Sequence, residues 1–429
     1  MADVLVNENS LSAIADAIRA AGFTADTFKV AEMAAAIAGL DRLPGLNDNS
    51  LTAFDTDSGD IRSNLFYGKG WRSDAPTPRL ARVNITSDGA QNGEIFVGEN
   101  AFRDCGLLTS VAVKPGKKLA VSKYAFSGCR ALAAIPPVSR LGERSFERCA
   151  ALSSIVLDGV DAISQYAFYS SGLAHLDITA APSGSYCFAA CTDLRDVIIN
   201  LPATLQSGNY AVGDNAFNGC TSLKTVSITS LRASWDDQIS SAAFYGCAAL
   251  ESLVTSGIKT IVSGSLNGCT SLATLTIPDV TNLGDLPPAA APLRHVYAPS
   301  CTTFRAMTNT TQHGVTSINL PALTVLSAGS LRNEAQMEAI NLPVCTSIGN
   351  GTSVAQQTFS GCTNLAVLLP GSTMATLASS ANIPATVTFY VNDALYETYL
   401  TATNWTAIQA QIHPMSDCPA AILALFEEE

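Results

Sequence analysis

The stretch "AFNGCTSLKTVSI", Ala216 to Ile228, contains the unit that decides the fold of this chain. Its first five letters return as "AFRDC" from Ala101, "AFSGC" from Ala125, "SFERC" from Ser145 and "AFYGC" from Ala243. The aligned aromatic residues, spaced by 20 to 29 residues, are Phe102, Phe126, Phe146, Phe168, Phe188, Phe217 and Phe244, and Leu266 continues the series. A repeat of this period predicts a solenoid, in which similar coils stack along one axis.

The sequence after each aromatic residue predicts a strand. Segments such as "LKTVSI", "LATLTI" and "LAHLDI" follow L-x-x-[LVI]-x-[LVI], and their last four residues alternate between apolar and polar. Such alternation is typical of a short strand with one buried face. The period and the strand together predict an α/β-type solenoid of leucine-rich repeats, a right-handed stack of coils with a parallel β-sheet.

The recurring Cys is predicted to be a buried free thiol. Phe and Cys are the inward residues of each coil's turn, opposite the strand, where a small and weakly polar side chain packs well. Disulfides between neighbouring coils are the alternative. In-register stacking disfavours them because it points the Cβ atoms of successive coils in parallel. Ser171 and Glu334 also interrupt the series of Cys residues.

Residues outside the repeats divide the chain into further segments. Residues 1–42 carry Leu11, Ile14 and Ile18, and then Val30, Met33 and Ile37, at helical spacing, which predicts a small N-terminal helical hairpin for attachment or oligomerisation. Residues 43–95 are predicted to be a β-containing connector and N-terminal cap. The solenoid is predicted to span residues 96–385, and residues 386–429 to form a C-terminal strand and helical cap with an acidic tail.

Composition excludes several classes of protein. The net charge is −12 and the pI is about 4.8. We therefore expect no nucleic-acid partner, because phosphate contacts need clustered Lys and Arg. No run of 18 apolar residues occurs, so no membrane insertion is expected. The first residues lack a basic region and an uninterrupted apolar run, and so do not form a secretory signal as written.

No catalytic or metal-binding motif stands out, so the sequence predicts neither an enzyme nor a cofactor. There is no G-x-S-x-G, H-E-x-x-H, P-loop or G-x-G-x-x-G. His175 and His295 occupy the same outward strand position about five coils apart, roughly 24 Å, so they cannot share a metal ion. His313 and His413 have no Cys, Asp or Glu at ligand spacing.

The remaining candidate is the outward face of the strands. Its residues are mostly small and uncharged, which suits a broad contact with protein or glycan as well as a plain solvated sheet. Within it, the polar and aromatic mixture around His295, Tyr297, Asn319 and Asn341 is the favoured ligand-binding region, and the other candidates are His175 and Asp177.

The repeated "F-x-x-C-x-x-L-x-x-[VI]-x-[IL]-P" unit and the ending "YVNDALYETYLTATNW" resemble the BspA-like leucine-rich repeat proteins, over roughly residues 95–412. The resemblance implies a solenoid without enzymatic activity of its own. Members of the family are typically surface or secreted binding proteins of gut and oral bacteria, implicated in adhesion to host matrix or other cells. They also occur fused in phage-encoded proteins.

The start of the chain carries a second resemblance. "NENSLSAIADAIRAAGFTADTFKVAEMAAAIAGL" looks like the helical segment that begins many tail and virion-associated proteins of phages infecting gut bacteria, with Val30 where Pro is common. It implies a homo-oligomeric virion component. Such a component would attach to other virion proteins through residues 1–42 and display the solenoid to a host-cell surface protein or glycan.

Two alternatives remain. The first is a bacterial cell-surface or secreted adhesin that binds host protein or glycan. The second is an enzyme with a site in the long insertions at Asn200–Asn215 and Thr229–Ser241.

Overall fold

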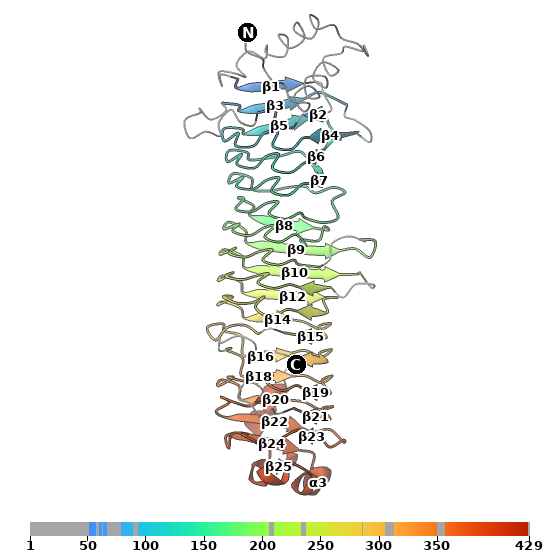
Figure 1. The fold of residues 1–429 in the computed structure, drawn as a ribbon, viewed down its shortest axis with the longest axis vertical. Helices are drawn as coiled ribbons and strands as arrows, with labels where there is room; N and C mark the ends of the chain where they lie inside the picture. The colour runs from blue at the N-terminus through green and yellow to red at the C-terminus, as the bar shows by residue number, and fades with distance from the viewer. Residues whose placement is uncertain are drawn as a thin grey trace, which may run out of the picture.

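The structure, a computed structural model, is one elongated stack of coils (Figure 1). It describes residues 51–427 except 57–59, 62, 67–78, 89–92, 206–209, 233–236, 285, 305–312 and 350–356. The helical hairpin predicted for residues 1–42 lies outside the described residues. The predicted parallel β-solenoid is confirmed, since each paired strand runs parallel to the next.

The predicted strands form one face of the stack, divided into three sheets. The first sheet holds β1 (Ala53–Thr56), β3 (Arg82–Ile85) and β5 (Ser110–Val113). The second holds β8 (His175–Ile178), β9 (Asp196–Leu201), β10 (Thr225–Ser230), β12 (Ser252–Ser256) and β14 (Thr274–Thr276). The third holds β16 (His295–Tyr297), β18 (Ser317–Asn319), β20 (Ala339–Asn341), β22 (Leu365–Leu369), β24 (Val387–Val391) and β25 (Ile412–Pro414). We call this surface the strand face.

A second column of short strands runs along the stack, and the sequence did not predict it. It holds β2 (Asp60–Ile61), β4 (Glu94–Val97), β6 (Lys118–Val121) and β7 (Val138–Leu141) in one sheet. It continues with β11 (Gln238–Ile239), β13 (Thr260–Ile261), β15 (Asn282–Leu283) and β17 (Thr303–Phe304), and then β19 (Val325–Leu326), β21 (Ser347–Ile348) and β23 (Thr376–Leu377). Most of these strands have two residues, which is too few to show an alternating pattern.

Residues 43–95 contain the beginning of the stack. β1 pairs in register with β3, and β3 pairs with β5. β2 pairs with β4 in the second column, and β4 pairs with β6. The strands of this segment therefore belong to the same two columns as the coils that follow.

The aromatic residues of the repeat form a continuous column inside the stack. Successive rings have centroids 5.2–5.4 Å apart and lie within 19° of parallel, and the column consists of Phe66, Phe102, Phe126, Phe146, Phe168, Phe188, Phe217 and Phe244. These rings are buried. Parallel rings at this separation are favourable beyond the burial of their area, so the column holds successive coils in register.

The structure supplies a reason for Cys in the repeat beyond its small size. In seven coils the thiol donates to the backbone carbonyl of the aromatic or leucine residue of the preceding coil, with Sγ–O distances of 3.1–3.3 Å. For example, Cys129 donates to Phe102 O and Cys149 to Phe126 O. All twelve cysteines are buried and free, as predicted.

The backbone bends sharply on both sides of each buried ring. The residues two before and two after the ring have positive φ, for instance Tyr124 (56°) and Gly128 (78°) around Phe126. Glycine adopts this conformation at little cost, which explains "GC" in "AFSGC", "AFNGC" and "AFYGC". The Phe126 amide donates to Ser145 O of the next coil, so the bend is also hydrogen-bonded between coils.

The C-terminal segment closes the stack as predicted, with a strand followed by a helix. After β24 come α3 (Tyr396–Thr401) and a 3-10 turn, η4 (Thr406–Gln411). Trp405 packs edge-on against Phe389 and Tyr399. Trp405 Nε1 donates to Ala375 O at 3.0 Å, and the Ala375 amide donates to Tyr399 Oη at 2.7 Å. The cap therefore covers the last coil without leaving these polar groups unpaired.

The tail beyond the cap folds back over the strand face. The 3-10 turns η5 (Met415–Asp417) and η6 (Ala424–Phe426) flank α4 (Ala420–Leu423). Their apolar side chains, with Cys418, pack on the outward residues Ala339, Ala366 and Leu368. The tail therefore covers part of β20 and β22 on the strand face.

Candidate binding surfaces

The central sheet presents a mostly polar part of the strand face. Parallel pairing aligns its outward side chains in two columns. The first column holds His175, Asp196, Thr225, Ser252 and Thr274, and the second holds Asp177, Ile198, Ser227, Val254 and Thr276. Thr225 donates to Asp196 across the strands at 2.7 Å. His175 and Asp177 are exposed at the edge of this sheet, on β8.

The other four candidate residues lie together in the third sheet. Tyr297 pairs in register with Asn319, and Asn319 with Asn341. Asn341 Nδ2 donates to Asn319 Oδ1 at 3.0 Å, while His295 Nδ1 lies 2.6 Å from Ser317 Oγ. His295 and Tyr297 are exposed, and the two Asn are half-buried. We call His295, Tyr297, Asn319 and Asn341 the β16–β20 patch.

The folded-back tail limits how far this patch extends. The outward residues of the next strand, β22, are the apolar Ala366 and Leu368, and both are buried under the tail. Two positions that the strand pattern places on the exposed face, Ser317 and Ala339, are buried as well. The pattern of a single strand could not show the burial of Ala339, because the tail that covers it is more than 70 residues away along the chain.

Two buried polar clusters are structural. His313 Nδ1 lies 2.6 Å from Glu334 Oε1, and both side chains are buried. The two residues are 21 positions apart, which is one coil, so they show no ligand spacing in the sequence. In the Thr229–Ser241 insertion, Asp237 is buried and accepts hydrogen bonds from Arg232 and Ser230. The carboxylate of Asp237 is therefore engaged in hydrogen bonds within the insertion and is not free for acid–base chemistry.

A column of planar side chains that was not predicted from the sequence follows the bend of the first coils. Arg103 lies 4.6 Å from the Tyr124 ring centroid, and Arg144 lies 4.0 Å from that of Tyr166. Tyr166 stacks on Tyr186 at 5.0 Å. The three Tyr and Arg144 stand two residues before a buried Phe, so aligning the repeats would have revealed them. Each planar group covers the face of its neighbour, which stabilises the bend.

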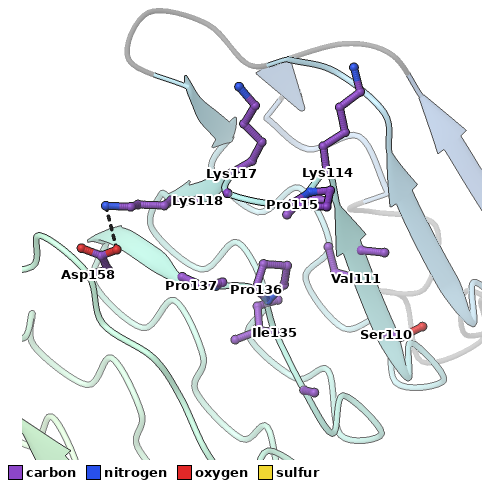
Figure 2. A pocket seen from close by; sticks show the side chains of 14 residues that line it. Ser110, Val111, Lys114, Pro115, Lys117, Lys118, Ile135, Pro136, Pro137 and Asp158 are labelled. Carbon is purple, nitrogen blue, oxygen red and sulfur yellow. Dashed lines mark ion pairs between the residues drawn. The ribbon is translucent and has the colours of Figure 1, made fainter.

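A pocket of about 480 Å³ opens where the strand face is interrupted after β5 (Figure 2). Its lining includes Val111 and Val113 of β5 and the segment Ile135–Pro137 of the next coil. Lys114, Lys117 and Lys118 stand at its rim. Lys118 is paired with Asp158 at 2.8 Å. Lys114 is paired with Asp88 at 2.9 Å, and this hydrogen bond lowers the pKa of Asp88.

The described part of the chain shows no group of three or more His, Cys, Asp or Glu side chains placed to hold a metal ion. Within the same residues, no helix has the length and apolar character needed to cross a membrane.

Residues 120–210 and 183–308 match the family model described as "BspA type Leucine rich repeat region", in six copies. The coils in this part of the chain are therefore similar to BspA-type leucine-rich repeats. The resemblance drawn from the repeated unit is confirmed at this level. None of the curated proteins matches the chain.

Several solved structures are similar to the chain. A leucine-rich cell surface protein from Faecalibacterium prausnitzii is 17% identical, with a TM-score of 0.30, over 75% of this chain and 88% of that one. A leucine-rich repeat protein from Bacteroides ovatus is 18% identical, with a TM-score of 0.36, over 78% and 79%. The pneumococcal vaccine antigen PcpA is 12% identical, with a TM-score of 0.39, over 86% and 88%.

Proposed function

We propose that this chain is a non-enzymatic binding protein that contacts a protein or glycan through its strand face. The observation that carries the proposal is the β16–β20 patch, where an exposed Tyr stands beside an exposed His and two half-buried Asn on adjacent strands. Tyr is enriched among residues that dominate binding energy. The Asn amides add hydrogen-bonding groups on a rigid sheet. The BspA-type match supports a binding role, since repeats of this type are typically non-enzymatic.

We further propose that the protein acts at a bacterial cell surface. The match to BspA-type repeats favours this location because members of that family are typically surface or secreted binding proteins. The virion interpretation depends on residues 1–42, which lie outside the described residues, and the comparisons give it no support. Antibody labelling of intact source cells should therefore decorate the cell envelope. Labelling confined to phage particles would contradict this location.

Changing Tyr297 to Ala should weaken binding at least about tenfold, because an aromatic side chain at the centre of a contact commonly contributes 1.4 kcal/mol or more, roughly a factor of ten. The measurement is the affinity of the full chain for a mammalian glycan array and for immobilised extracellular-matrix proteins. Tyr245→Ala is the matched control, since Tyr245 is 51% exposed at a bend and Tyr297 is 43% exposed on the strand face. Equal losses in the two variants, or no loss in Tyr297→Ala, would contradict the assignment of the patch.

A further inference from the structure

The strand face has an open edge in its interior. β5 is the last strand of the first sheet, and the second sheet begins only at β8. The next coil contacts β5 through a single bridge, Ser110 to Ala134, and then departs from it. The two residues that follow Ile135 are Pro136 and Pro137.

The two prolines explain why the edge is open. In this stack, strands pair by donating backbone N–H groups to the carbonyls of neighbouring coils, as Lys224 N does to Arg195 O. Proline has no N–H and cannot donate to such a ladder. Among the described residues, β5 beyond Ser110 therefore has a strand partner only on its β3 side. An unpaired edge of this kind can pair with another chain.

The pocket beside this edge has a definite chemistry. Its floor is apolar, formed by Val111, Ile135 and the proline rings, and Val113 of β5 lies along it. Its rim carries three of the chain's eight lysines, although the whole chain has a net charge of −12. Lys114 and Lys117 rise from the turn at one end of the pocket (Figure 2). Lys114 and Lys118 pair with Asp88 and Asp158, and Lys117 adds a further positive charge that is complementary to an acidic partner.

We propose that this pocket binds an extended, acidic polypeptide segment, which adds as a strand to the free edge of β5. Main-chain hydrogen bonds to β5 supply affinity. Alternate side chains of the segment supply specificity, because one set meets the apolar floor and the other reaches the lysines. β5 has three residues beyond the bridged Ser110, so the segment needs about three to five. This site is separate from the β16–β20 patch and does not rest on the proposed function.

The test uses the full chain and the peptide Ac-Glu-Val-Glu-Val-Glu-Val-NH2, with affinity measured by fluorescence anisotropy. Lys117→Glu should weaken binding at least about tenfold and reduce its salt dependence. Ala134→Phe, at an exposed position in the pocket lining, should abolish binding by filling the pocket. Lys224→Glu, the matched charge reversal at an exposed lysine in a distant coil, should leave the affinity unchanged.

Backbone methylation separates strand addition from simple charge attraction. Methylating the three Val amides blocks one edge of the peptide, and methylating the three Glu amides blocks the other. One of these peptides should lose about tenfold or more in affinity, since each lost hydrogen bond contributes about 1 kcal/mol, while the other retains binding. Equal binding of both methylated peptides and the parent would overturn the proposal. Binding of heparin in place of the peptide, with the same loss in Lys117→Glu, would also overturn it, because it would identify a site for an anionic glycan.

Discussion

Raising the pH from about 8 to about 11 should unfold the protein cooperatively, because the buried thiols ionise less readily in the folded chain than in the unfolded chain. Burial raises the pKa of Cys105, Cys247 and Cys362 to about 12, and that of Cys301 to about 11. A thiol in an unfolded chain titrates near pH 8.5. The folded chain therefore holds protons that the unfolded chain has released.

The sign and size of the effect follow from this difference. Since the folded pKa is raised, the contribution to stability is complete below about pH 8.5 and is lost as the pH rises toward the folded value. Each thiol that is ionised only in the unfolded chain lowers the free energy of unfolding by about 1.4 kcal/mol per pH unit. Several such thiols together exceed a typical stability of roughly 5–15 kcal/mol within one or two pH units.

The pH of half-unfolding, followed by circular dichroism, measures this effect. A variant with Cys129, Cys149 and Cys191 changed to Ser should unfold at a higher pH, because three titrating groups are gone. Ser can donate the same hydrogen bonds, and Ser171 already occupies one position of the series. An unchanged midpoint in this variant would show that other groups cause the alkaline unfolding.

Changing Phe168 to Ala should lower the free energy of unfolding by about 3–5 kcal/mol, the usual loss for truncating a buried Phe. Phe168 stacks between Phe146 and Phe188, with centroids at 5.4 and 5.2 Å, so its removal leaves a cavity between two coils. Because each coil contacts only its neighbours, the defect should weaken the coils on both sides most. Urea denaturation measures the total loss, and hydrogen exchange locates it.

Phe96→Ala is the matched control for Phe168→Ala. Phe96 lies on β4 and is 43% exposed, so its truncation should change stability by less than about 1 kcal/mol. Similar losses in the two variants would mean that the buried column does not hold the coils together.

The sequence predicted the repeat, the strand face and the buried thiols, because each depends on a local pattern that recurs with the coil. Phe126 and Cys129, for example, are identified by their spacing alone. The second column of strands was not predicted, because two-residue strands such as β13 are too short to show a periodic pattern. The hydrogen bonds that the thiols donate were not predicted either, because the bond from Cys129 to Phe102 O joins residues in different coils.

In the candidate site, too, the features that follow a local pattern were predicted and the contacts between distant segments were not. The register of β16, β18 and β20 brings Tyr297, Asn319 and Asn341 together as the strand positions suggested. The packing of the tail on Ala339 and Leu368 could not be predicted, because it joins segments with no common pattern. The pairing of His313 with Glu334 is likewise a contact between coils.

The most direct test of the stacked coils is a count of thiols with Ellman's reagent at pH 8, before and after denaturation in guanidinium chloride. If the coils stack as described, at most one thiol, Cys418 in the tail, reacts in the native protein, and all twelve react after denaturation without reductant. Rapid reaction of several thiols in the native state would contradict the buried column. A count well below twelve in the denatured state would show disulfides where the structure has hydrogen-bonded thiols.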